Sequence, residues 1–109
     1  MSRSNWKEAE RRAAKMIDGQ RYGANTGGLV DVESAFFVGQ VKERKNLSLA
    51  QLEALVRLIT EVGKTKGKAG IVLVKRSAGS GNRTPWLVVM DEDAFRKYRQ
   101  DFIRGVDDA

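Results

Sequence analysis

The fold depends on residues 28–43, which read GLVDVES from 28 to 34 and AFFVGQVKE from 35 to 43. Two short runs rich in β-branched and aromatic residues, 29–34 and 36–43, lie almost end to end. Runs of this kind are typical of strands, and so short a connection favours an antiparallel hairpin.

The hairpin carries four polar residues whose faces follow from strand geometry. Side chains alternate along a strand, so Asp31 is expected to share a face with Glu33. For the same reason Gln40 is expected to share a face with Lys42. If the register brings the two faces together, two carboxylates, an amide oxygen and an ammonium group converge. Such a set suits Mg²⁺-dependent hydrolysis of a phosphodiester.

Helices are expected at three places in the chain. The first spans residues 4–18, where an apolar stripe begins at Trp6. The second opens at Ser48 with the pattern Ser-x-x-Gln of a capping box and is expected to stop at Gly63. The third spans 91–104, with an aspartate as its cap and two acidic residues in its first turn.

Two further strands are expected at 71–74 and 86–90, both as buried strands. The glycine-rich segment 21–28 can contain one more short strand. The predicted order is α-β-β-β-α-β-β-α, which indicates an α/β fold with a small mixed sheet flanked by helices. At 109 residues the chain has room for a single domain, residues 1–109.

Two residue types are missing, and their absence excludes several classes of site. The chain has no Cys and no His. Zinc fingers, thiol nucleophiles, Ser-His-Asp triads and histidine acid–base chemistry are therefore excluded. A metal site in this chain must bind a hard cation through oxygen ligands.

The net charge of +6 is concentrated in one part of the sequence. Residues 62–90 contain no acid, whereas the rest of the chain carries as many acidic as basic residues. The basic residues of this stretch are Lys64, Lys66, Lys68, Lys75, Arg76 and Arg83. A local excess is expected of a surface that meets phosphate, although ordinary solubilising charge would look similar.

No apolar run approaches the length that crosses a bilayer, and no apolar stretch of a signal peptide follows Met1. An intracellular, cytoplasmic protein with no membrane partner is therefore expected. Gly27 and Gly28 fit neither a Walker nor a Rossmann pattern, so no nucleotide cofactor is expected.

A third acid is available on the first helix. On a helical wheel Glu10 falls inside the apolar sector, whereas Glu8 faces water. Burying a carboxylate is costly unless a partner compensates it, so Glu10 is the better candidate to reach the sheet, as a metal ligand or as a partner of Lys42. The alternative is a surface acid at the border of the stripe, paired with Lys7 or Arg11.

These residues together resemble a known family. Asp31 is followed nine residues later by Gln40-Val41-Lys42, and an acid lies on the preceding helix. This pattern resembles the PD-(D/E)XK nuclease superfamily, in particular archaeal-type Holliday junction resolvases and related phage-encoded endonucleases. The resemblance spans residues 6–95. It implies a restriction-endonuclease-like fold, Mg²⁺ as cofactor with Mn²⁺ as substitute, a homodimer, a role in DNA recombination and repair, and the host cytoplasm if the protein is phage-encoded.

The resemblance also implies roles for individual residues. The metal ligands would be Asp31, Gln40, the Val41 carbonyl and Glu10, and the motif lysine would be Lys42. One departure is clear, since Gln40 stands where the family has Glu or Asp. The site then has one negative charge fewer and should bind a cation more weakly, unless Glu33 compensates.

Contacts with DNA are expected on three segments. The expected residues lie past the motif strand, in the glycine-rich loop and in the acid-free stretch: Arg44, Lys45, Arg21, Asn25, Thr26, Lys64, Lys66, Lys68 and Arg83. The aromatic residues are expected in the core, which favours recognition of the DNA backbone over base stacking.

The leading hypothesis from the sequence is a Mg²⁺-dependent endodeoxyribonuclease that resolves Holliday junctions. A nicking or non-specific nuclease with the same site is the first alternative. A second is a catalytically inert DNA-binding module of the same fold, and a third is a basic RNA-associated protein.

Overall fold

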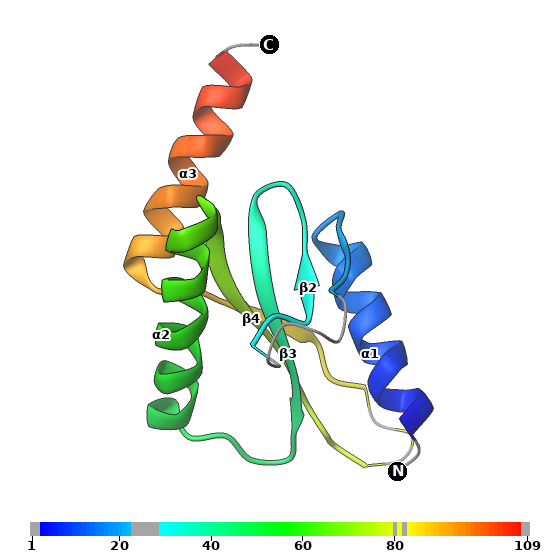
Figure 1. Ribbon diagram of the computed structural model, residues 1–109. Coiled ribbons are helices and arrows are strands. Elements are labelled where there is room, and N and C mark those ends of the chain that lie inside the picture. The colour runs from blue at the N-terminus through cyan, green and yellow to red at the C-terminus, as the bar shows by residue number, and fades with distance from the viewer. Residues whose placement is uncertain (1–2, 23–28, 80, 82, 108–109) are drawn as a thin grey trace.

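The structure is a computed structural model that describes residues 3–22, 29–79, 81 and 83–107, with side chains for 7–22, 29–79, 81 and 83–102. Helices and strands alternate along the chain (Figure 1). Their order is α1 (Arg3–Met16), β1 (Gln20–Arg21), β2 (Val32–Glu33), β3 (Phe37–Arg44), α2 (Leu49–Lys66), β4 (Ala69–Arg76), β5 (Trp86–Val89) and α3 (Glu92–Asp107).

The five strands form one mixed sheet in the spatial order β1-β2-β3-β4-β5. Only β3 and β4 are parallel, and α2 makes the crossover between them. The other three pairs are antiparallel, including the predicted hairpin of β2 and β3. The α/β class and the mixed sheet predicted from the sequence are therefore confirmed.

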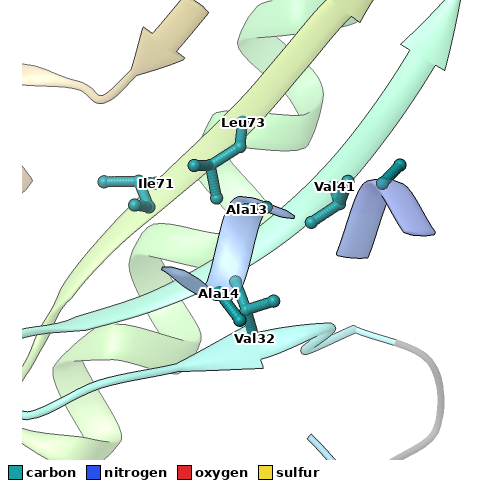
Figure 2. Close-up of a cluster of buried hydrophobic side chains, with 7 residues drawn as sticks. Ala13, Ala14, Val32, Val41, Ile71 and Leu73 are labelled. Carbon is teal, nitrogen blue, oxygen red and sulfur yellow. The ribbon is translucent and has the colours of Figure 1, made fainter. Parts of the chain in front are cut away.

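Each face of the sheet is covered by a helix, and each interface has its own apolar cluster. On the α1 face, Ala13 and Ala14 pack against residues of three strands, among them Val32 and Leu73 (Figure 2). On the α2 face, Val56 and Ile59 pack against valines that include Val38. The alanines of α1 are small, so this helix can lie close to the strands that carry the candidate site.

The second helix starts as predicted but does not end as predicted. Ser48 caps it, and both hydrogen bonds of the capping box with Gln51 are present. The predicted stop at Gly63 is wrong, because α2 continues to Lys66 and ends at Gly67, whose φ is 67°. A Cβ on Gly63 would lie 2.5 Å from the Lys68 carbonyl oxygen, so this glycine is needed for contact with the chain that enters β4.

The strand predicted at 86–90 is present, but the prediction that it is buried is wrong. β5 is the edge of the sheet and pairs only with β4, so it lacks a neighbour on its outer side. Leu87 and Val88 are 53% and 48% exposed. The third helix follows at once, with the Asp91 carboxylate accepting a hydrogen bond from the Ala94 backbone N–H, as expected of its cap.

None of the helices in the described part of the chain is long and apolar enough to span a membrane.

Candidate active site

The candidate site lies where β2 separates from β3, and Asp31 is at the point of separation. The Asp31 N–H donates to the Gly39 carbonyl on β3, whereas its own carbonyl accepts from Tyr22 next to β1. In a regular antiparallel strand both groups would point to the same neighbour. The backbone is therefore kinked at Asp31, which explains why Val30 and Val32 pack on opposite faces of the sheet.

The kink turns the Asp31 carboxylate toward the β3 backbone. Its Oδ2 accepts a hydrogen bond of 2.8 Å from the Val41 N–H. In a regular sheet this N–H would bond to a carbonyl of β2. Here the Asp31 side chain takes the place of that carbonyl, because β2 no longer pairs with β3 at this point. The regular register ends with Val32 opposite Gly39, so Asp31 lies beside the next residues of β3. The structure thus brings Asp31 to the motif residues on β3, as the spacing in the sequence predicts.

Glu10 reaches the same place from α1. It is 3% exposed, and its Oε1 accepts a hydrogen bond of 3.0 Å from Nε of Arg21 on β1. Glu8, by contrast, is exposed and pairs with Arg11. The prediction that Glu10 rather than Glu8 faces the sheet is therefore confirmed.

Glu10 and Asp31 form a pair of neighbouring carboxylates. Burial raises the pKa of Glu10, the hydrogen bond from Arg21 lowers it, and the nearby Asp31 carboxylate raises it again, with a net increase. Arg21 is thus the counter-ion of Glu10, whereas Asp31 bonds to the Val41 N–H. The sequence interpretation missed this role of Arg21, which it assigned to phosphate contact. The sequence carried no clear signal for it, because Lys7 and Arg11 are closer to Glu10 in the chain.

Gln40 and Lys42 approach from the other face of the sheet. Val38 and Val41 of β3 pack on the α2 and α1 faces respectively, so strand alternation puts Gln40 and Lys42 on the α2 face. Gln40 is 4% exposed, and its Oε1 has no hydrogen-bond partner within the described residues. Lys42 is half-buried and makes no ion pair in the same part of the chain.

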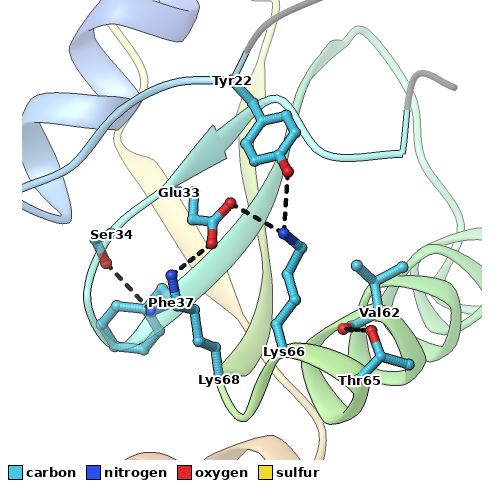
Figure 3. Close-up of polar contacts among 8 residues, drawn as sticks. All are labelled: Tyr22, Glu33, Ser34, Phe37, Val62, Thr65, Lys66 and Lys68. Atoms are coloured by element: carbon cyan, nitrogen blue, oxygen red, sulfur yellow. Dashed lines mark hydrogen bonds and ion pairs between the residues drawn. The ribbon is translucent and has the colours of Figure 1, made fainter. Parts of the chain in front are cut away.

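Glu33 does not belong to this site, contrary to the expectation that it shares a face with Asp31. The kink directs its carboxylate to two lysines at the end of α2 and just after it, 2.5 Å from Lys68 Nζ and 3.4 Å from Lys66 Nζ (Figure 3). Burial would raise the pKa of Glu33, but the two lysines outweigh it and the pKa is lowered. Glu33 is thus already neutralised and is not placed to compensate for Gln40.

Residues 62–90 contain no acid, but in the folded protein acids from other parts of the chain lie next to their lysines. Lys66 pairs with Glu33 and also donates to the Tyr22 hydroxyl at 3.0 Å. Lys64 lies 3.0 Å from Glu61 and 3.6 Å from Asp93. The expectation that 62–90 forms one uncompensated basic surface is therefore wrong, because folding brings acids from other elements to its first lysines.

The other residues expected to bind DNA fall in three places. Arg44, Lys45 and Arg83 lie at the far end of the sheet from Lys64, Lys66 and Lys68. Arg21 forms an ion pair with Glu10. Asn25 and Thr26 lie outside the described residues.

The donor set of the site fits a hard cation only in part. Across the residues that the structure describes, no three acidic side chains gather as metal ligands would. Two carboxylates are present, from Glu10 and Asp31, and the remaining oxygens would have to come from Gln40 and the Val41 carbonyl. The Gln40 oxygen is buried without a partner on the α2 face, as Thr60 Oγ1 and Trp86 Nε1 are elsewhere in the described residues, and such an atom is costly to leave unsatisfied.

In comparisons with known proteins, no family model, no curated protein and no solved structure matches the chain.

Proposed function

We propose that the protein is a divalent-metal-dependent DNA endonuclease of the PD-(D/E)XK type that cleaves branched DNA, with the four-way junction as its main substrate. The observation that carries the proposal is the hydrogen bond from the Val41 N–H to the Asp31 carboxylate. This bond holds Asp31 against the backbone of the Gln40-Val41-Lys42 segment. Glu10, a second acid, is buried on α1 next to Asp31.

In this proposal Mg²⁺, or Mn²⁺ in its place, would be held by Asp31, Glu10 and the Val41 carbonyl. Gln40 lies on the other face of the sheet, so its amide oxygen would join them only after a change in the side chain's position. A bound cation polarises the scissile phosphate and acidifies a water molecule. Lys42 stabilises the negative charge that develops on the phosphate. Arg21 is paired with Glu10 and would have to release it for Glu10 to hold a cation.

The first test is cleavage of a synthetic four-way junction with Mg²⁺ and with EDTA. We expect cleavage only with Mg²⁺, and we expect Asp31→Asn or Lys42→Ala to abolish it. Binding of the junction should survive in both variants, because each changes one group at the site and leaves the other basic residues in place. Full cleavage by both variants would contradict the proposal that Asp31 and Lys42 belong to a nuclease site.

A plain duplex of the same total length separates the resolvase from a nicking or non-specific nuclease. The resolvase predicts preferential cutting of the junction. Equal cutting of the two substrates would leave the nuclease in place and remove the preference for branched DNA.

A second candidate is a DNA-binding module of this fold without catalytic activity. Two observations favour it: Glu10 is already paired with Arg21, and Gln40 brings no charge to the site. It predicts no change in melting temperature with Mg²⁺ or Mn²⁺. Gln40→Glu is the informative variant, because restoring the third acid should create or strengthen metal binding if the site is a metal site.

A further inference from the structure

The sheet has one end at which basic residues gather without acidic partners. Because β3 and β4 are parallel, their carboxyl ends meet at the same edge of the sheet, and the β4–β5 connection also lies there (Figure 1, lower end). Five basic residues belong to this region, which we call the basic end: Arg44, Lys45, Lys75, Arg76 and Arg83.

The basic end differs from the opposite end of the sheet in its ion pairs. Among the described residues, no acid lies within ion-pair distance of any of its five side chains, and Arg44 donates only to a neighbouring backbone carbonyl. At the opposite end, each of Lys64, Lys66, Lys68 and Lys97 has an acidic partner. The basic end is therefore a cluster of five basic side chains without acidic partners among the described residues, whereas these four lysines are paired.

Two arginines of the basic end repel each other. Arg44 and Arg76 are register partners on neighbouring strands, so both project from the same face of the sheet. Like charges on neighbouring side chains repel each other, most of all where no opposite charge lies between them. With no acid nearby to relieve it, this arrangement is stabilised by an external anion.

The N-terminus of α2 adds to the positive charge of the basic end. It lies at this end of the sheet, and the first turn of α2 contains no acid. The N-terminus of α3 lies near the opposite end, where Asp93 meets Lys64, and its first turn carries Glu92 and Asp93. A helix N-terminus has a partial positive charge, and that of α2 is not compensated by an acid in its first turn, unlike that of α3.

We propose that the DNA backbone lies across the basic end, and that Lys64, Lys66 and Lys68, in the last turn of α2 and just after it, take no part in binding. This inference rests on the proposed function. Arg44 follows Lys42 by two residues on the same face, about 7 Å further along the strand, so the basic end continues outward from the candidate site. Its members are charged rather than aromatic, which fits contact with phosphates and not base stacking.

The test compares two double variants that each remove two positive charges. Arg44→Gln with Arg76→Gln alters the basic end, and Lys64→Gln with Lys66→Gln is the matched control at the opposite end. Fluorescence anisotropy with a labelled four-way junction, at several salt concentrations in EDTA, measures binding without cleavage. Circular dichroism and thermal melting check that both variants are folded. If the first variant does not fold, Lys45→Gln with Arg83→Gln replaces it, since both residues lie in loops.

We expect the basic-end variant to lose about 2 from the slope of log K against log salt, and to bind about tenfold more weakly. The control should bind as the wild type does. Equal losses in both variants, or a larger loss in the control, overturn the inference and leave the nuclease proposal intact. No binding of DNA by the wild type, or stronger binding of RNA of the same sequence, overturns the proposed function itself.

Discussion

At the scale of single residues, Asp31 has a structural task as well as its proposed chemical one. Its carboxylate satisfies the Val41 N–H at the point where β2 no longer can. A part-buried donor without a partner is costly, so the position would favour an acceptor even in a protein without catalysis. Stability and activity can therefore be separated at this residue.

Replacing Asp31 by Ala or by Asn should make that separation visible. Asp31→Ala leaves the Val41 N–H without its acceptor and should lower the free energy of unfolding by about 1–3 kcal/mol. Asp31→Asn keeps an amide oxygen for this bond and removes the repulsion with Glu10, so it should lose less. Urea unfolding of both variants measures the difference, and an Asn variant less stable than the Ala variant would contradict the structural role.

The two buried acids should affect stability with pH in opposite directions. The pKa of Glu10 is raised above its ordinary 4.5, so its contribution to stability is complete below pH 4.5 and is lost as the pH rises through the raised value. The pKa of Glu33 is lowered, so its contribution is present above pH 4.5 and is lost as the pH falls.

Single variants test this opposition. Relative to Glu10→Gln, the wild type should lose stability as the pH rises from below 4.5 toward neutral. Relative to Glu33→Gln, it should lose stability as the pH falls below 4.5. Thermal unfolding across this range gives both differences, and two differences with the same sign of slope would show that the two environments are wrongly described.

At the scale of elements, the close contact between α2 and β4 depends on glycines. Cβ atoms added at Gly63 and Gly70 would lie 2.5 Å and 2.2 Å from backbone carbonyl oxygens. These oxygens belong to the chain entering β4 and to α2 itself, and they have little freedom to move. The crossover helix can therefore lie against the sheet only where these side chains are absent.

Gly63→Ala should destabilise the protein although it replaces glycine by alanine inside a helix. Helix propensity alone favours Ala by about 1 kcal/mol, but the clash with the Lys68 carbonyl should outweigh it and leave a net loss of about 1–3 kcal/mol. Ala54→Gly, at an exposed position of the same helix, is the control and should cost about 1 kcal/mol. A stabilised Gly63→Ala variant would contradict the packing described for α2.

At the scale of the whole molecule, the basic residues at the two ends of the sheet differ in their partners. At one end lysines and acids from α2, α3 and β2 neutralise one another. At the other end the carboxyl ends of β3 and β4 present basic residues without acidic partners in the described chain. The second end is adjacent to the candidate site, which suits binding and cleavage of one substrate.

A junction resolvase needs two symmetric cuts, so we expect a twofold homodimer with one site in each subunit. Sedimentation equilibrium should give about twice the 12.1 kDa of the chain. The same measurement with the four-way junction should give two chains for each junction. A monomer both alone and on the junction would argue against resolution and in favour of a nicking enzyme.

The sequence by itself determined the helices, the hairpin and the acids that come together. Local rules are sufficient for these features: the capping box at Ser48, the apolar stripe that places Glu10 on the inner side of α1, and the spacing between Asp31 and Gln40. Each depends on residues close in sequence or on a strong periodicity.

Only the tertiary structure decided the partners of the charged residues. Glu33 pairs with Lys66 and Lys68, and not with the candidate site, because the backbone kinks at Asp31. Regular strand alternation does not predict such a kink. Arg44 and Arg76 became neighbours because β3 and β4 are parallel, although they are far apart in the chain. Charge interactions depend on distance in space, so an acid-free segment of sequence becomes a basic surface only where folding brings no acid to it.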